Sequence, residues 1–430
     1  MADCALAGQG TFLLNEQQGV PAMLSPQVQI QLNAFQTIYK QSILYPAFKE
    51  RLRKSKSTEI YSIGGNSLLR GEDVKGLMPW KKDDWQKISD IQKDRIKETL
   101  RHILPELKKG GIITHGNGPE AGAVLDRWLG RFLDGNKDQE FINQKLAQGV
   151  KETQEWIGAD IKEALMSLGI SENQIEVVMT DVRVDAADEG FTNPKKPIGL
   201  ARFKTVNGKE EPIPRVLVAS PKPKSIVQID KIEKAIRAKK IVICVGGGGI
   251  AVDMNNQARS LPAVIDKDLA TACLAESLFK SRYSAEQKPL SRVIISTDVK
   301  RVYLDYGRST QRPISNITAD RLQQYIDSGE FAGTEGSMLP KLQAAISIIK
   351  SGAAKEVIIT NPENLAKIDK GGLHTRIERS PKNSFDDIAI QGLDEKKTPR
   401  QNIALSQVPI SAYPQQAGGL EFQLIIAQAI

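Results

Sequence analysis

The feature that most limits how this chain can fold is a run of four glycines at 246–249, directly after an apolar segment at 241–245. A short apolar run that ends in glycines is typical of a buried parallel strand leading into a tight loop. Because glycine has no Cβ, the backbone N–H groups of such a loop can approach an anion closely. A second apolar run, at 263–265, leads into an Asp-Lys-Asp triplet at 266–268. We expect a second strand there, followed by charged groups suited to handling phosphate.

Two other interpretations of the glycine run stay open. Two core strands joined by ordinary loops would give the same pattern. Gly246, Gly248 and Ala251 also match the G-x-G-x-x-A fingerprint of dinucleotide binding, and Asp266 lies about where a ribose ligand is expected. That fingerprint needs a helix after the glycines, and an Asn-Asn pair at 255–256 interrupts its face. A nicotinamide- or flavin-dependent oxidoreductase is therefore an alternative.

Composition narrows the functional classes. The 430 residues carry a net charge of +8, with Lys and Arg spread among Asp and Glu, which argues against nucleic-acid binding and suits anionic substrates. Three widely separated cysteines show no metal-ligand spacing, so we expect a reducing compartment and no protein-bound metal. No apolar run is long enough to span a membrane, and the first thirty residues lack a signal-peptide pattern. These features predict a cytoplasmic protein without a membrane partner.

Two earlier strands also end in glycine–asparagine turns. An expected strand at 60–63 leads into Gly-Gly-Asn at 64–66, and one at 111–114 leads into His-Gly-Asn-Gly at 115–118, with a helix expected at 121–132. Ligands bind at the carboxyl ends of parallel strands, and helix N-termini there favour phosphate. We assign no base chemistry to the histidine, because a lone histidine beside a turn is usually structural.

Strands and helices alternate along the chain. Helical patterns cover 83–107, 139–168, 230–238, 269–281, 317–328 and 342–350, and strand patterns cover 175–180, 292–296, 302–306 and 357–360. This alternation, without a long repeat, predicts a parallel, doubly wound α/β sheet.

Three segments depart from the alternation. The stretch 185–214, which contains Asn-Pro-Lys-Lys-Pro-Ile-Gly, predicts an insertion or small hairpin lid, although its lysines alone favour an exposed, solvated loop. A basic amphipathic helical pattern at 27–52 could bind a membrane surface or partner, but is more typical of a helix packed on its own domain. The pattern weakens after 377.

Eight short motifs occur in the order found in carbamate kinases, and the chain resembles that family of the amino-acid kinase superfamily over most of its length. The motifs are GGNSL at 64, HGNGPEAG at 115, NPKKPIG at 193, SPKPKSIV at 220, CVGGGGIAV at 244, VIDKDLA at 264, TDVKRVYLDYG at 297 and GSMLPK at 336. The resemblance implies an α/β three-layer sandwich with a mainly parallel central sheet and a small protruding subdomain. It implies a kinase domain at 58–377 with a lid insertion at about 183–215, an N-terminal helical extension at 1–57 and a C-terminal extension at 378–430.

The activity implied by the resemblance is reversible phosphoryl transfer, ATP + carbamate = ADP + carbamoyl phosphate. It implies Mg²⁺ held largely by the nucleotide, a place in arginine metabolism and a homodimer. It gives catalytic roles to Lys196, Lys267, Asp268 and Lys341. It gives substrate binding to Gly64, Gly65, Asn66, Gly116, Asn117 and Gly118, and nucleotide binding to Gly247, Gly248, Thr297, Asp298, Tyr303 and Met338.

Several positions depart from the family pattern. Lys300 and Arg301 stand where an acidic or amide residue and glycine are common, Leu339 replaces a usual glycine, and Glu120 replaces a usual glutamine. The loop at 331–341, which ends at Lys341, also carries extra residues. Two alternatives follow: a related kinase for another small carboxylate or carbamoyl compound, and a non-catalytic regulator that uses the extra termini.

Overall fold

The structure is a computed structural model that describes residues 58–281, 289–334 and 337–380. The helical pattern expected at 27–52, the extension at 1–57 and nearly all of the extension at 378–430 lie outside the described residues.

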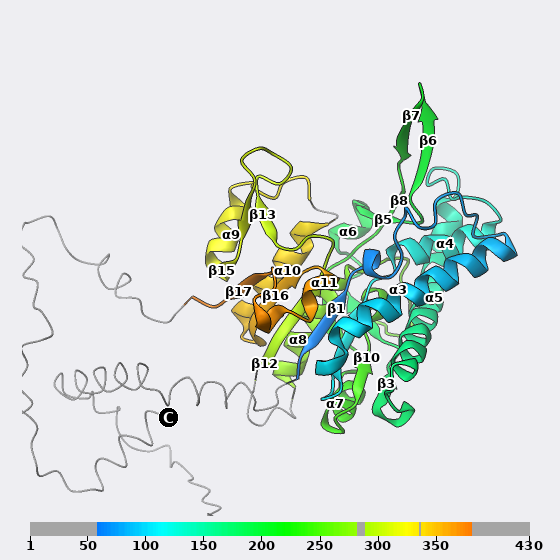
Figure 1. The fold of residues 1–430 in the computed structure, drawn as a ribbon. Helices are drawn as coiled ribbons and strands as arrows, with labels where there is room; N and C mark the ends of the chain where they lie inside the picture. The colour runs from blue at the N-terminus through cyan, green and yellow to red at the C-terminus, as the bar shows by residue number, and fades with distance from the viewer. Residues whose placement is uncertain (1–57, 282–288, 335–336, 381–430) are drawn as a thin grey trace, which may run out of the picture. The chain divides into compact units, whose positions relative to one another are not determined.

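An eight-stranded sheet forms the centre of the fold (Figure 1). Its pairs are parallel except β16 with β17, which confirms the predicted mainly parallel sheet. The strand order is β15 (Asn316–Thr318), β17 (Thr375–Glu378), β16 (Ala354–Thr360), β12 (Leu290–Ser296), β1 (Ile60–Ile63), β2 (Gly111–His115), β10 (Ile241–Ile243) and β3 (Ile175–Val177).

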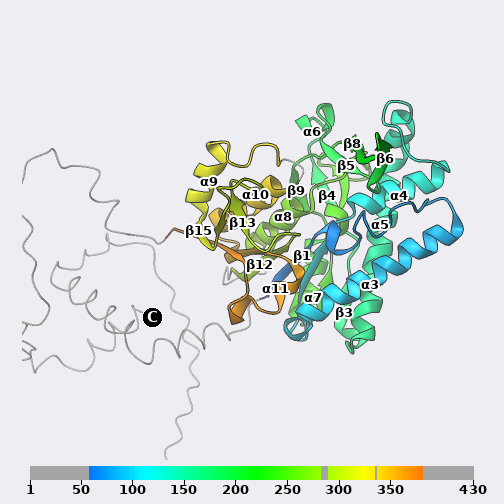
Figure 2. The same ribbon diagram turned by 45° about the horizontal axis from the view of Figure 1, so that its top comes forward.

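Helices cover both faces of this sheet, because successive strand residues point to opposite sides. Ile112 belongs to one apolar core and its neighbour Ile113 to another. The core that includes Ile112 packs under α7 (Ile229–Arg237), α8 (Lys267–Lys280), α9 (Ala319–Asp327) and α10 (Met338–Ser351). The other packs under α3 (Lys82–Leu107), α5 (Gln139–Ser167) and α11 (Pro362–Leu365). Figure 2 shows α8 and α10 across the sheet from α3, so the predicted three layers are confirmed.

The chain leaves the glycine run as a strand and not as a helix. Val245 and Gly247 have φ values of 52° and 63°, and these left-handed residues turn the chain through a 3₁₀ turn, η3 (Gly246–Gly248). A small sheet of order β11 (Ile250–Asp253), β4 (Asp181–Val184) and β9 (Pro223–Ile226) then forms. A dinucleotide fingerprint requires a helix at this point, so the oxidoreductase interpretation is wrong.

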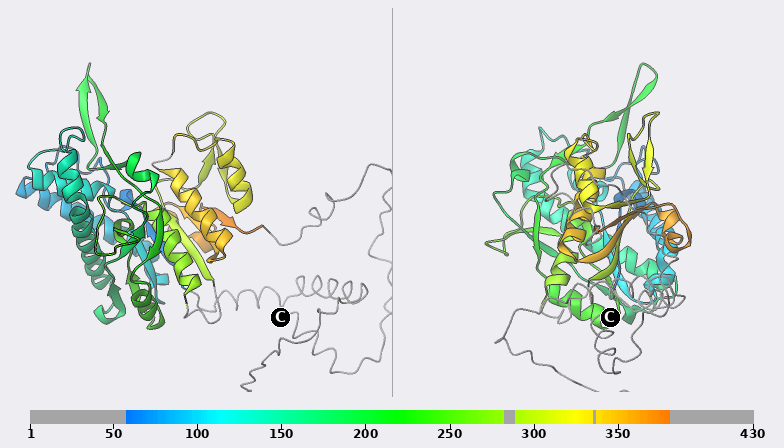
Figure 3. Two further views of the ribbon diagram at one scale, coloured as in Figure 1. Left: turned by 180° about the vertical axis from the view of Figure 1, so that it is seen from behind. Right: turned by 90° about the vertical axis from the view of Figure 1, so that its left-hand side faces the viewer.

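A two-stranded pair carries the inserted segment. Strand β5 (Lys196–Ile198) pairs with β8 (Val216–Val218), and the hairpin of β6 (Arg202–Val206) and β7 (Lys209–Ile213) runs between them. Figure 3 shows the hairpin standing out from the body of the molecule. We call residues 196–218 the lid. The base of the lid is fixed against α4 (Gly118–Leu129), because a Cβ on Gly122 would lie 2.2 Å from the Gly199 nitrogen.

The remaining short elements connect the layers. They are a hairpin of β13 (Val302–Leu304) and β14 (Arg312–Ile314), the single turn α6 (Glu189–Thr192), and the 3₁₀ turns η1 (Gly65–Ser67), η2 (Glu172–Gln174) and η4 (Ile368–Lys370). None of the helices within the described ranges is both long and apolar enough to cross a membrane.

Some expected boundaries were wrong. No strand forms at 263–265, where Ala263 makes only an isolated bridge with Ala219. Helix α8 begins two residues earlier than expected because Asp266 caps it. Helix α10 begins at Met338, before Pro340, since proline is tolerated in a first turn that needs no N–H donor. Helix α4 also begins early, at Gly118, and Gly130 in the left-handed conformation ends it.

Candidate active site

A pocket of about 260 Å³ opens where the strand-ending turns meet the N-termini of α4, α8 and α10. Helix N-termini favour anions, because their first N–H groups lack intrahelical partners and the helix dipole is positive there. The lining residues are Gly64, Gly65, Ser67, Gly116, Asn117, Gly118, Pro119, Lys196, Pro197, Arg215, Gly247, Val264, Ile265, Asp266, Lys267, Asp268, Ser296, Thr297, Asp298, Ser337 and Lys341.

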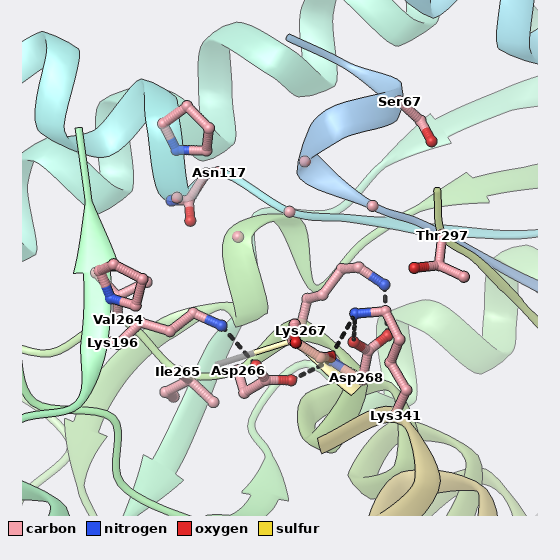
Figure 4. A pocket seen from close by; sticks show the side chains of 18 of the residues that line it. Ser67, Asn117, Lys196, Val264, Ile265, Asp266, Lys267, Asp268, Thr297 and Lys341 are labelled. Atoms are coloured by element: carbon pink, nitrogen blue, oxygen red, sulfur yellow. Dashed lines mark hydrogen bonds and ion pairs between the residues drawn. The ribbon is translucent and has the colours of Figure 1, made fainter. Parts of the chain in front are cut away.

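The glycine turns after β1 and β2 form one wall of the pocket. They pack closely, since a Cβ on Gly116 would lie 3.2 Å from the Gly65 nitrogen. Asn117 is buried, and its amide donates to the Thr153 hydroxyl at 2.8 Å, which holds the side chain at the start of α4. Figure 4 shows Asn117 across the pocket from Asp266. This wall therefore presents backbone and amide donors at fixed positions.

The glycine run after β10 brings a third turn against this wall. A Cβ on Gly247 would lie 2.2 Å from the Asn117 amide nitrogen, and one on Gly248 would lie 2.3 Å from the Ile265 carbonyl oxygen. Both residues also have positive φ. Only glycine fits these two positions, because any side chain would collide with its neighbour and strain the backbone.

The first turn of α8 forms what we call the pocket floor, which consists of Asp266, Lys267 and Asp268 together with Lys341 from α10. The Asp266 carboxylate accepts the Asp268 backbone N–H at 2.9 Å and so caps α8. Asp268 forms ion pairs with both lysines, to Lys341 at 3.0 Å and to Lys267 at shorter range. Figure 4 shows the two ammonium groups converging on this carboxylate. Asp268 therefore sets the position of both cations.

A chain of buried hydroxyl groups supports the floor from behind. The Lys267 ammonium donates to the Ser62 hydroxyl at 2.8 Å, and Ser62 lies 3.3 Å from the Thr271 hydroxyl. Thr271 in turn bonds to Thr114 at 2.8 Å and donates to the Lys267 carbonyl at 2.7 Å. These contacts join β1, β2 and α8, so Lys267 is held by the core of the sheet.

Opposing charges counteract the effect of burial on the floor, to a different extent for each of its groups. Burial alone would raise the pKa of Asp268, but Lys267 and Lys341 hold it well below its usual value. Burial lowers the pKa of Lys267 and outweighs the opposing effect of Asp268. Burial also lowers the pKa of Lys341, but the carboxylates of Asp268 and Asp266 outweigh this effect and raise its pKa. The floor is thus a compact set of compensated charges.

The histidine of the second turn is unsuited to base catalysis. His115 is 1% exposed, and burial lowers its pKa to about 4, with Lys267 adding to the effect. Its Nδ1 lies 3.0 Å from the Gly116 carbonyl, so the neutral ring donates to the turn. This agrees with the structural role expected from the sequence.

One lysine of the lid contacts the pocket floor. The Lys196 ammonium lies 2.5 Å from the free oxygen of the Asp266 carboxylate. Lys196 and Asp266 are 70 residues apart in the chain. The sequence analysis placed Asp266 in the charged triplet at 266–268 and as a possible ribose ligand, but did not pair it with Lys196. The same carboxylate therefore caps α8 and anchors the lid.

Most of the residues singled out from the sequence meet at the pocket. All four expected catalytic residues line it, with five of the six expected substrate-binding residues and Gly247, Thr297 and Asp298. Asn66 lies in η1, and its side chain is outside the described part. The pocket lining does not include Gly248, Tyr303 or Met338.

The sequence analysis missed several side chains that the fold brings here. Ser62 and Thr271 support the floor, and Arg215 lines the pocket from the lid. Serine and threonine in apolar segments carry no distinctive pattern, so no local signal identified the hydroxyl groups. Arg215 lay at the end of the expected lid insertion at about 183–215, but only the β5–β8 pairing shows that it lies beside the pocket.

Comparison with known proteins decides the family. Residues 58–361 match the Amino acid kinase family. The chain belongs to this family. It is 33% identical to the carbamate kinase of Staphylococcus haemolyticus over 309 residues, which cover 67% of this chain and 94% of that protein. It is also 33% identical to a carbamate kinase-like protein of Escherichia coli over 321 residues, with 70% and 92% covered. Within its family the chain is carbamate kinase-like.

A solved structure gives the same result. The carbamate kinase of Giardia lamblia, determined with AMP-PNP bound, matches with a TM-score of 0.59 at 26% identity. The match covers 76% of this chain and 99% of that one. The fold and the family inferred from the eight motifs are confirmed.

Proposed function

We propose that this amino acid kinase transfers a phosphoryl group reversibly between ATP and carbamate, forming ADP and carbamoyl phosphate. The observation that carries the proposal is the convergence of Lys196, Lys267 and Lys341 on two carboxylates, beside three helix N-termini. Its carbamate kinase relatives, similar over most of their length, support the same reaction.

The chemistry requires positioning and charge neutralisation more than covalent catalysis. As a phosphoryl group passes between carbamate and ADP, negative charge spreads over its oxygens. Lys267 and Lys341, fixed by Asp268, would contact these oxygens from the floor, and Lys196 would approach from the lid. Preorganised donors lower the barrier because they need no reorganisation during the step.

The glycine wall would hold the small acid. Backbone N–H groups of Gly64, Gly65, Gly116 and Gly118 and the Asn117 amide would surround the carbamate and the transferring phosphoryl group. Asn66 remains a proposed substrate contact. Carbamate is already an anion, so no base is needed to create the nucleophile, in agreement with the buried, low-pKa histidine.

The nucleotide would approach from the side of Gly247, Thr297 and Asp298, which line the pocket. We keep Gly248, Tyr303 and Met338 as proposed nucleotide contacts outside the pocket lining. Magnesium would enter with the nucleotide phosphates as part of the substrate, because Mg²⁺ prefers phosphate oxygens and water to an all-protein site. In the part of the chain that the structure describes, no acidic, His or Cys cluster is suited to hold a metal by itself.

A second candidate is phosphoryl transfer to another small carboxylate. It is motivated by Lys300 and Arg301 near the nucleotide side, and by a similar Escherichia coli relative that is named only carbamate kinase-like. Lys300 is exposed, and Thr360 donates to its carbonyl at 3.3 Å. This position lies beside the carboxyl end of β16, close to Thr297, whose N–H donates to the Thr360 carbonyl.

The test is ATP formation by the purified full chain from ADP, magnesium and an acyl phosphate. Carbamoyl phosphate and acetyl phosphate are supplied separately, and ATP is followed by luciferase luminescence. We expect carbamoyl phosphate to be preferred by at least about tenfold in kcat/KM. A preference for acetyl phosphate would favour the second candidate, and no ATP from either would reject the proposal.

We further propose a cytoplasmic homodimer that functions in arginine metabolism, with extensions at 1–57 and 378–430 flanking the kinase domain. A regulatory role for the termini is the alternative to a purely catalytic chain. Removing residues 1–57 tests it, since unchanged activity and unchanged mass in light scattering would show that this extension contributes to neither.

A further inference from the structure

Among the residues that the structure describes, the charges that line the pocket leave one cation without a partner. Three lysines and Arg215 line it, together with the carboxylates of Asp266, Asp268 and Asp298. Each lysine forms an ion pair with one of the first two carboxylates. No described residue forms a hydrogen bond or ion pair with the Arg215 guanidinium, and no neighbouring charge contributes to its pKa.

Arg215 is held in place by the lid. It directly precedes β8, whose Val216 pairs with Ile198 and whose Val218 pairs with Lys196. Arg215 and Lys196 therefore belong to the two neighbouring strands at the base of the lid, and both side chains line the same pocket. Because Gly199, which directly follows β5, packs closely against Gly122 of α4, the two cations share one support.

The surroundings of Arg215 weaken its hydration without neutralising its charge. Arg215 is exposed, yet the protein around it lowers the pKa of its guanidinium by desolvation alone. An uncompensated cation of this kind gains most from an anion that enters the pocket. The guanidinium presents a planar fork of donors that matches two oxygens of a phosphate or carboxylate.

We propose that Arg215 is a substrate-binding residue that contacts the phosphoryl group of the bound acyl phosphate from the lid. This inference rests on the proposed function for the identity of the acyl phosphate. The anion site itself does not depend on that identity. Lys196 already has Asp266 as a partner, whereas Arg215 gains its first partner when the substrate binds, so Arg215 contributes more to affinity than to turnover.

The test measures binding of inorganic phosphate to the full chain by calorimetry, without nucleotide. Arg215→Ala should raise the Kd for phosphate about tenfold to a hundredfold, the range for a lost charge-assisted hydrogen bond, and Arg215→Lys should lie between that variant and the wild type. Lys209→Ala is the matched control. Lys209 is an exposed residue of the lid hairpin outside the pocket, and its loss removes the same charge.

Kinetics give a second readout. We expect Arg215→Ala to raise the KM for carbamoyl phosphate by a similar factor while leaving the KM for ADP unchanged. Wild-type phosphate affinity in Arg215→Ala, an equal loss in Lys209→Ala, or no phosphate binding by the wild type would each overturn the inference. If the wild-type chain makes no ATP but binds phosphate, and the Arg215→Ala variant loses that binding, the anion site is supported and only the proposed substrate is rejected.

Discussion

The pocket floor and the lid both present cations to the same space, but the protein holds them differently. Lys267 is buried, and its ammonium group bonds to a carboxylate and to a hydroxyl of the central sheet. Lys196 depends on one ion pair to a residue of the floor, and Arg215 has no partner among the described residues. From this difference we infer separate roles for the two regions: the floor determines the rate, and the lid determines substrate affinity.

The largest expected effect comes from removing the central cation of the floor. Lys267→Ala should lower kcat about 1000-fold, because a preorganised charge at the transferring group is lost. Lys280→Ala, an exposed lysine at the far end of the same helix, is the control and should retain full activity. Circular dichroism should show that both variants are folded. Near-normal turnover by Lys267→Ala would remove the floor from the catalytic account.

Loss of the carboxylate that orients the two lysines should have the next largest effect. Asp268→Asn keeps the shape of the side chain but removes the charge that holds Lys267 and Lys341, so kcat should fall about 100-fold. Asp126→Asn is the matched control, because Asp126 is also buried but lies outside the pocket lining. Equal losses of activity in the two variants would mean that any buried aspartate has this effect.

A buried acid that no neighbouring charge compensates should affect the stability of the protein differently from the charged groups of the floor. Both carboxyl oxygens of Glu120 are buried without a hydrogen-bond partner among the described residues, and burial raises its pKa from 4.5 to about 8. The folded state therefore keeps the proton that the unfolded chain releases, and stability falls as the pH rises from about 4.5 through 8.

Glu120→Gln removes this titration. We expect it to stabilise the protein by a few kcal/mol above pH 8, at about 1.4 kcal/mol for each unit of pKa shift, and to have little effect below pH 4.5. Urea unfolding at several pH values measures the difference. A stability difference that does not vary with pH would show that Glu120 is compensated like the floor.

The smallest expected effect lies at the contact between the two regions. Asp266→Asn retains a good helix cap, because asparagine caps as well as aspartate, but it loses the charge that holds Lys196. We expect the KM for carbamoyl phosphate to rise about tenfold with a smaller change in kcat. Asp188→Asn, which alters the cap of a helix outside the pocket, should change neither value. If Asp266→Asn lost more kcat than Asp268→Asn, the proposed separation of rate and affinity between floor and lid would be contradicted.

Local patterns in the sequence predicted the sheet and the edge at which the site forms. The apolar runs that end at Gly64, Gly116 and Gly246 placed three turns at the carboxyl ends of parallel strands, where the pocket lies. Lys267 and Asp268 stood out because they are adjacent and charged after an apolar run. Neighbouring residues with a shared local pattern are what a sequence shows most directly.

Contacts between distant segments could not be predicted in the same way. The pairing of Lys196 with Asp266 and of Lys267 with Ser62 depends on how the lid and strand β1 meet α8. The early starts of α8 and α10 also escaped prediction, because the Asp266 cap and the position of Pro340 gain meaning only from the local backbone geometry. Arg215 stands out because its guanidinium has no partner among the described residues, and a sequence does not show which charged side chains are paired.

Steady-state kinetics of Lys267→Ala and Arg215→Ala, measured side by side with carbamoyl phosphate and ADP, test the central claim most directly. The account predicts that Lys267→Ala loses kcat by about three orders of magnitude. It predicts that Arg215→Ala raises the KM for carbamoyl phosphate at least about tenfold with kcat nearly unchanged. The opposite pattern, with kcat lost in the lid variant and only KM changed in the floor variant, would contradict the account.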